Sequence, residues 1–277
     1  LPVGPISVLY YADRVAQLPL GVVGIAIGTA LLPLMARELR AGRTAAAMAN
    51  QNRAIEYGLL FSLPAALALG QLAEPIIRIL FEHGRFSPDD TTRSAGALAA
   101  FAVGLPAFVM VKALTPGFFA REDTRTPLFI AMAAITTNIV LNVVFLYGTA
   151  LAQVGIALAS SLSGWLNAAL LAAVLLRRGQ WAPDSRLGSR TLRVAIAALG
   201  MGAGLWGALV FLGPLLAHGN LAGIAALLAI CALGSVLYGA LGALLGVVRL
   251  SELRYVLHRP PDLEPAGLRS ADPGEQP

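Results

Sequence analysis

Residues 126–176 read TPLFIAMAAITTNIVLNVVFLYGTALAQVGIALASSLSGWLNAALLAAVLL and contain no charged side chain over 51 positions. Residues 194–248 form a second uncharged run, of 55 positions. About 20 apolar residues are enough for a helix to cross a bilayer, so each run is long enough for two spans. Gly148 and the turn at residues 218–220 divide the two runs into hairpins. These runs predict a polytopic α-helical membrane protein.

The chain as a whole is also strongly apolar and poor in charged residues. Of its 277 residues 57% are hydrophobic and 13% charged, and its mean hydropathy is +0.73, whereas soluble domains are about 25% charged. The stretches between charges predict about seven spans, at residues 6–36, 57–73, 94–119, 127–147, 152–176, 194–217 and 221–248. Ser87 and Thr126, each followed by proline, are predicted to cap helix starts. The expected fold class is all-α, a transmembrane helix bundle.

Arginine is distributed unevenly over the connections between these spans. Three arginines lie on one side, at positions 78, 85 and 93, and fourteen on the other as far as residue 259, at positions 37, 40, 43, 53, 121, 125, 177, 178, 186, 190, 193, 249, 254 and 259. Arginine-rich loops stay in the cytoplasm, so the C-terminus is expected there and the first helix is expected to begin outside. That arrangement needs an odd number of upstream spans if the native N-terminus is also cytoplasmic. Because the chain opens on Leu1 without a signal peptide, we expect that an N-terminal part is missing.

Several classes of function find no support in the sequence. The net charge of +5 follows from the loop arginines, so nucleic-acid binding is not expected. The single cysteine, Cys231, can form neither an intrachain disulfide nor a thiolate metal cluster. His83, His218 and His258 lack metal-binding spacing, and neither a nucleophile elbow nor a phosphate-binding glycine loop occurs. We therefore expect no catalytic residue, no metal site and no enzymatic activity.

Two connections and the tail differ from the spans. Residues 74–86 carry charges every four positions beside apolar residues, which predicts a short amphipathic helix, a connector lying on the outer surface. Trp181 and the neighbouring arginines suit the anionic headgroups of the cytoplasmic leaflet. The proline-rich tail after His258 is expected to be disordered.

Asp13 and Arg14 are ionisable residues within the first predicted span. One possibility is that they lie at the outer interface, with Arg14 reaching the headgroups. The other is an internal polar cavity, because residues 6–36 would form a straight helix of about 46 Å, longer than the roughly 30 Å core of a bilayer. Pro19 and Pro33 favour a break in this helix, and broken helices at membrane depth line cavities. We favour the cavity for Arg14.

Later spans contain Lys112, the only lysine of the chain, and several side chains that carry oxygen. Snorkelling can explain Lys112, but a second cation in a cavity with Arg14 would suit an anionic ligand such as phosphate. Asn138 and Asn142 share one helix face, and Ser160 lies on the next helix. Their oxygens could ligate a hard cation such as Na⁺, although interhelical hydrogen bonds are the commoner use. Glycine pairs at 24/28, 200/204 and 242/246 predict close helix packing.

Residues 10–14 (YYADR), 17–21 (QLPLG) and 24–33 (GIAIGTALLP) form one distinctive block, and residues 112–121 (KALTPGFFAR) and 123–127 (DTRTP) form a second. Both closely resemble the lipid II flippase MurJ (MviN) family of the MOP exporter superfamily. The likeness extends from the start to about residue 254. Members of that family have fourteen spans. The resemblance therefore implies that this chain runs from the eighth span to the last and lacks the N-terminal half of the same protein.

The resemblance also implies a division of the chain and a function. Residues 1–193 would form the second lobe of the transporter core, 194–250 two helices whose groove receives the polyprenyl tail, and 251–277 a cytoplasmic tail. The protein would flip lipid II, the undecaprenyl-pyrophosphate-linked peptidoglycan precursor, across the bacterial cytoplasmic membrane by alternating access, for cell wall synthesis. By analogy, Arg14 would line the cavity near the pyrophosphate, Asp13 would orient it, and Lys112 would be a further cavity cation. Lipid II, membrane lipids and the missing half are the implied partners, and no cofactor is implied.

Departures from the family pattern and alternative functions qualify this prediction. Some relatives hold Na⁺ through an asparagine and a carboxylate, whereas Asn138, Asn142 and Ser160 have no acid beside them, which puts sodium coupling in doubt. Without the first lobe, the chain alone should not transport. An exporter of another polyprenyl-linked glycan or of small cations is the nearest alternative, and a non-transporting membrane scaffold is another. A membrane-embedded transferase would need paired carboxylates or histidines in the spans, which the sequence lacks.

Overall fold

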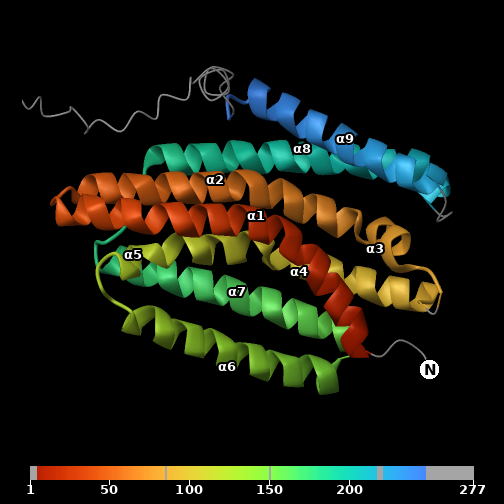
Figure 1. Ribbon diagram of the computed structural model, residues 1–277, viewed down its shortest axis with the longest axis horizontal. Helices are drawn as coiled ribbons and strands as arrows, with labels where there is room; N and C mark the ends of the chain where they lie inside the picture. The colour runs from red at the N-terminus through yellow and green to blue at the C-terminus, as the bar shows by residue number, and fades with distance from the viewer. Residues whose placement is uncertain (1–4, 85, 150, 217–220, 248–277) are drawn as a thin grey trace, which may run out of the picture.

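The computed structural model describes residues 5–247 except 85, 150 and 217–220, and every regular element in that part is a helix (Figure 1). The helices are α1 (Pro5–Arg40), α2 (Thr44–Gln71), α3 (Ala73–Phe81), α4 (Pro88–Leu114), α5 (Pro116–Phe119), α6 (Arg125–Gly148), α7 (Ala152–Arg177), α8 (Ser185–Leu216) and α9 (Leu221–Leu244). Seven of these are long and apolar enough to cross a membrane. The predicted bundle of about seven spans is confirmed, and the protein is a multi-pass membrane protein. The turn at 218–220 and the tail after residue 258 lie outside the described residues.

Two helices begin earlier than the sequence predicts. α2 starts at Thr44 rather than at residue 57, and α8 starts at Ser185 rather than at residue 194. Charged residues indicate a loop in both segments, but the charges on the two helices pair with one another inside the protein. The third predicted span is divided by Pro116 into α4 and α5.

α1 is one continuous helix, so the predicted break is wrong. Pro19 and Pro33 both lie inside it. Each proline removes one backbone donor and crowds the preceding turn, which bends a helix without ending it when the surrounding turns persist. Figure 1 shows the bend, with the N-terminal part of α1 inclined to the rest.

The starts of α4 and α6 differ in their capping. Ser87 caps α4 as predicted, because its hydroxyl accepts a hydrogen bond from the Asp90 N–H (3.2 Å) while the Asp90 carboxylate accepts one from the Ser87 N–H (3.0 Å). Thr126 is not a cap, because α6 begins one residue earlier, at Arg125. The Asp123 carboxylate instead accepts hydrogen bonds from the N–H (3.0 Å) and the hydroxyl (2.7 Å) of Thr126.

The short helix α3 corresponds to the amphipathic helix predicted at residues 74–86. Arg78 pairs with Glu74 (2.5 Å) and with Glu82 (3.4 Å), one turn away in each direction. At its end, the Phe81 ring packs against Tyr11 of α1, with 4.6 Å between ring centroids. This contact fixes α3 against the N-terminal part of α1.

α4 lies at the centre of the bundle and packs against α1, α2 and α7. Gly104 allows α7 to approach closely, because a Cβ at that position would lie 2.5 Å from the Ser161 Oγ and 2.8 Å from the Ser161 Cα. The Ser161 hydroxyl donates to the Ala100 carbonyl (2.7 Å), and the Trp165 indole N–H donates to the Val103 carbonyl (3.0 Å). Small residues and interhelical hydrogen bonds thus join the two helices, as is typical within membranes.

α8 and α9 form a hairpin along one edge of the bundle, and α6 lies along the opposite edge (Figure 1). Gly200 and Gly204 face Leu241 and Leu237 of α9, as the predicted packing of this glycine pair requires. In the other two pairs the second glycine does not pack as predicted, although Gly24 faces the Lys112 side chain of α4. Gly246 lies beyond the end of α9 with a φ of +66°, and nothing lies within 4 Å of a Cβ placed on Gly28.

Candidate substrate pocket and a buried ion network

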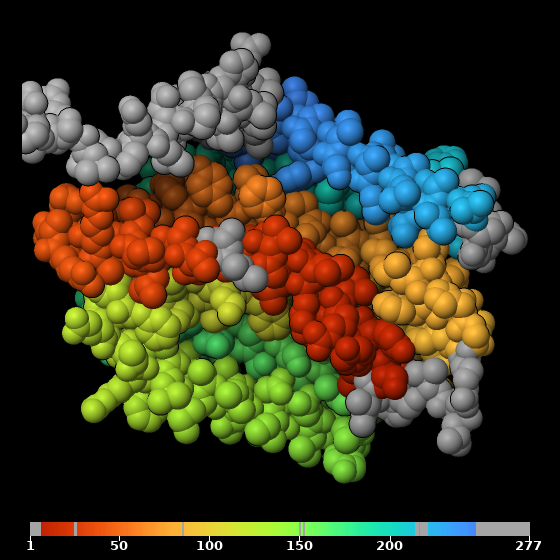
Figure 2. Space-filling view, in the orientation of Figure 1, coloured from red at the N-terminus to blue at the C-terminus, as the bar shows by residue number. Residues whose placement is uncertain are grey.

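A pocket of about 710 Å³ lies between α1, α4 and α7. Three glycines of α1, at positions 21, 24 and 28, leave room for it, and its polar lining comes from Asp13, Gln17, Thr29, Lys112 and Ser160. In Figure 2 the surface is hollowed between α1 and α6, with α4 and α7 behind the hollow. We call this hollow the Asp13–Lys112 pocket.

The structure places Asp13 in the pocket wall and Arg14 beside it. The Gln17 amide donates a hydrogen bond to the Asp13 carboxylate (2.5 Å) and accepts one from the Arg14 guanidinium (3.4 Å). Arg14 is exposed, and its guanidinium lies over the Tyr10 ring, 4.8 Å from the ring centroid. Arg14 is therefore joined to the pocket through Gln17 and is not one of the residues that line it. Gln17 was not singled out as a site residue from the sequence, although it lies one helical turn from Asp13.

Lys112 reaches the pocket from α4, facing the wall formed by α1. It is exposed and makes no ion pair or hydrogen bond with any other described residue. The same side chain borders a second hollow of about 460 Å³ between α4, α6 and α7. An ammonium group that no described residue pairs with, at the junction of two hollows, is suited to bind an anion.

Two of the three residues that suggested a cation site, Asn138 and Ser160, line the second hollow, and Asn142 does not. The Asn138 amide donates toward the hydroxyls of Ser160 (3.4 Å) and Ser163 (3.3 Å), and Asn142 donates to the Asn138 oxygen (3.0 Å). These groups form hydrogen bonds with one another between α6 and α7, which is the interhelical alternative to a cation site. The Asn142 oxygen is buried without a hydrogen-bond partner. Within the described ranges, no cluster of three or more His, Cys, Asp or Glu residues could hold a metal ion.

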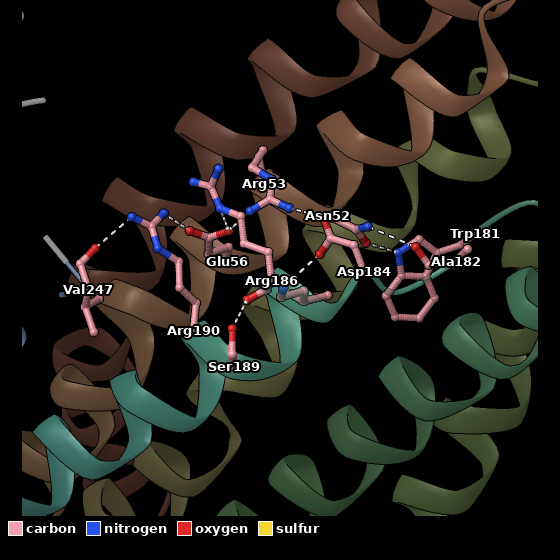
Figure 3. Close-up of polar contacts among 11 residues, drawn as sticks. Asn52, Arg53, Glu56, Trp181, Ala182, Asp184, Arg186, Ser189, Arg190 and Val247 are labelled. Carbon is pink, nitrogen blue, oxygen red and sulfur yellow. Dashed lines mark hydrogen bonds and ion pairs between the residues drawn. The ribbon is translucent and has the colours of Figure 1, made fainter. Parts of the chain in front are cut away.

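A buried ion network, which the sequence did not indicate, joins α2 to α8 (Figure 3). Its members are Arg53, Glu56, Asp184, Arg186 and Arg190, and we call it the Glu56 network. The Glu56 side chain is only 3% exposed and pairs with Arg53 and Arg190, while the Arg186 Nε lies 3.6 Å from it. Arg53 also pairs with Asp184. Paired in this way, four of the five charges lie within α2 and α8 rather than in the loops that their polarity indicates, while Asp184 lies just before α8.

The connection between α7 and α8 is fastened to the same stretch of α2. The Asn52 amide donates to the Ala182 carbonyl (2.9 Å), and its oxygen accepts from the Trp181 indole N–H (2.6 Å). Trp181 is buried, so the prediction that it lies among lipid headgroups is wrong. The spacing of Asn52, Arg53 and Glu56 is the one available signal for this contact surface, since residues three and four apart share a helix face.

The KALTPGFFAR motif forms the junction between α4 and α5. Pro116 ends α4, and the buried Gln51 amide donates to the carbonyls of Ala113 and Leu114 in its last turn, each at 3.3 Å. Gly117 makes room for this side chain, because a Cβ there would lie 2.6 Å from the Gln51 Nε2. Arg121 then donates to the Gly117 carbonyl (2.5 Å) and the Gln180 carbonyl (2.9 Å).

The loop after α5 adds an ion pair at the same end of the bundle. Hydrogen bonds from Thr126 and then from Arg178 lower the pKa of Asp123 to about 2. The Arg178 guanidinium lies 2.6 Å from the Asp123 carboxylate. Asp123 thus stays ionised and holds the start of α6 against the end of α7.

Spanning helices around a pocket lined by ionisable side chains define a multi-pass membrane protein with a cavity between its helices, an architecture typical of transporters. The family model described as "Lipid II flippase MurJ" matches residues 1–225. The chain belongs to the lipid II flippase MurJ family.

Sequence similarity to individual proteins supports this family membership. A protein of Rhizobium meliloti (strain 1021) named "Probable lipid II flippase MurJ" is 50% identical over 203 residues, which cover 73% of this chain and 38% of the relative. A protein of the same name from Rhizobium tropici is 45% identical over 78% of this chain and 40% of the relative. One from Vibrio cholerae is 37% identical over 74% of this chain and 39% of the relative. The chain thus spans about two fifths of the length of these relatives.

A solved structure has the same fold. The structure titled "Lipid II flippase MurJ, inward closed conformation" matches with a TM-score of 0.69 and 24% identity, over 92% of this chain and 48% of that one.

Proposed function

We propose that this chain is the second lobe, with the last two helices, of a flippase that moves lipid II from the cytoplasmic to the periplasmic leaflet for cell wall synthesis. The observation that carries the proposal is the Asp13–Lys112 pocket in a chain of this family, because its ammonium, which pairs with no described residue, suits the pyrophosphate of the lipid head group. A polar pocket spares that charged group the large cost of entering hydrocarbon. Asp13 and Gln17 would orient the head group from the opposite wall.

In this proposal the lipid chain stays in apolar surroundings while the head group crosses. The α8–α9 hairpin carries the exposed apolar side chains suited to that chain, among them Trp206, Phe211 and Leu228. Alternating access by two lobes would then move the opening of the pocket from one side to the other. The chain would act with a first lobe and would have no catalytic role of its own.

The proposed location is the bacterial cytoplasmic membrane. The end that carries the α1–α2 and α7–α8 connections would lie in the cytoplasm, because it holds the larger share of the arginines. The C-terminus would lie on that side too.

Lys112→Ala tests the proposal in the full-length protein. We expect export of lipid II in cells depleted of their own flippase to fall about tenfold or more, because a hydrogen bond to a charged group contributes about 1.5–3 kcal/mol. Lys112→Arg should restore most of the export because it keeps the charge. Arg177→Ala is the matched control, since it removes an exposed cation that lines none of the hollows described above. Normal export by Lys112→Ala at normal protein levels would contradict the proposal.

We also propose that export does not need Na⁺ or any cofactor. Asn138, Ser160 and Ser163 already bond to one another, and no carboxylate joins them in the hollow. Replacing Na⁺ by K⁺ on both sides of the membrane of proteoliposomes should leave the rate of lipid II export unchanged. A rate that rises with the Na⁺ concentration would contradict this proposal.

A further inference from the structure

The α8–α9 hairpin is attached to the rest of the described chain mainly through α2, with a smaller contact to α3. Over most of its length this contact is apolar, with Leu72, Met201 and Leu205 buried in it. One hydrogen bond crosses it there, from the Tyr238 hydroxyl to the Leu60 carbonyl (2.6 Å). Apolar contact between helices gains little in a membrane, because lipid chains are as apolar as the side chains. Such a surface alone leaves the hairpin free to shift along α2.

The Glu56 network supplies directional contacts that fix the position of the hairpin along α2, which the apolar surface lacks. The side chains of Glu56 and Arg190 are 3% and 9% exposed, so both charges are removed from solvent and depend on each other. Arg190 also donates from its second Nη to the Val247 carbonyl (2.9 Å), just beyond the end of α9. One guanidinium therefore holds α2, α8 and the end of α9 together (Figure 3).

We propose that Glu56 and Arg190 are positioning residues that hold the α8–α9 hairpin in one place against α2. This role rests on the proposed function, in which the polyprenyl chain of a lipid lies on the apolar face of the hairpin while its head group lies in the Asp13–Lys112 pocket. The ion pair would fix the position of that face relative to the pocket. The ion pair is specific in direction and distance, whereas the apolar contact is not. Loss of the pair therefore displaces the hairpin even where the protein stays folded.

The experiment measures the position of the hairpin directly in the full-length protein. Cys231, the single cysteine of this chain, is exposed on α9, and Tyr147→Cys adds a second site on α6, at the opposite edge of the bundle. Any cysteines outside this chain are replaced first, and spin labels at the two positions report a distance distribution by pulsed electron paramagnetic resonance. The decisive variant is Glu56→Met with Arg190→Met, because it removes both charges and leaves no buried ion unpaired. Arg43→Met is the control, since it breaks the pair of an exposed arginine with Glu38 beside the α1–α2 connection at the same end of the bundle, and neither residue forms an ion pair or hydrogen bond with a described residue of α6 or the hairpin.

We expect one narrow distance distribution in the parent protein and in Arg43→Met, and a shifted or broadened one in the double variant at near-normal thermal stability. Export of lipid II should fall in the double variant alone. A narrow, unshifted distribution in the double variant would overturn the proposal, as would normal export from a displaced hairpin. Failure of the parent protein to export lipid II would contradict the proposed function instead, and it would leave the distance measurement intact.

Discussion

Glu56→Gln is expected to lower the free energy of unfolding by about 3–5 kcal/mol, the usual cost of breaking a buried ion pair from one side. Glu56 is the acid that Arg53, Arg186 and Arg190 share. Arg53 retains Asp184, but Arg190 retains only the Val247 carbonyl and stays buried with an uncompensated charge. Titration of the folded protein with a denaturing detergent in mixed micelles measures the loss.

Two comparisons separate this effect from a general loss of surface charge. Glu74→Gln breaks the pair with Arg78, in which Glu74 is 52% exposed, and should cost at most about 1 kcal/mol. Glu56→Met combined with Arg190→Met should recover most of the stability lost by Glu56→Gln, because a well-packed apolar pair replaces a buried ionic one at little cost. If Glu56→Gln were as mild as Glu74→Gln, the network would contribute nothing to stability.

The number of spans was predictable because long uncharged runs leave no alternative to membrane-spanning helices. The starts of α2 and α8 were not, because a charge in a sequence indicates a loop unless its partner is known. Glu56 and Arg190 are 134 positions apart, and only the tertiary fold brings them together. Trp181 illustrates the same limit, since its burial depends on Asn52, which lies 129 positions away.

The pocket was predictable in part. Ionisable residues are rare inside spans, so Asp13 and Lys112 stood out as candidates, and both line the pocket. Arg14 stood out equally, yet consecutive helical residues point about 100° apart, and the sequence does not say which of the two neighbours faces inward. Gln17 carries no charge and was recognisable only once its contacts with Asp13 and Arg14 were known.

Gly104→Leu is expected to cost about 3 kcal/mol or more, at or beyond the upper end of overpacking effects. Even its first side-chain carbon would lie 2.8 Å from the Ser161 Cα, and backbone cannot move aside as a flexible side chain can. The added bulk would also separate the Ser161 hydroxyl from the Ala100 carbonyl. Since α4 and α7 form two walls of the Asp13–Lys112 pocket, the variant should lose export together with stability.

Gly207→Leu is the matched control, because it makes the same change inside a long helix where nothing lies within 4 Å of the added Cβ. Leucine forms helix better than glycine, by about 0.5–1 kcal/mol, so this variant should be neutral or slightly more stable. The difference between the two variants in detergent titration therefore measures the close approach of α4 and α7, free of helix propensity. Equal stability of Gly104→Leu and Gly207→Leu would mean that α4 and α7 can separate at this point, and that their close contact does not hold the pocket walls in place.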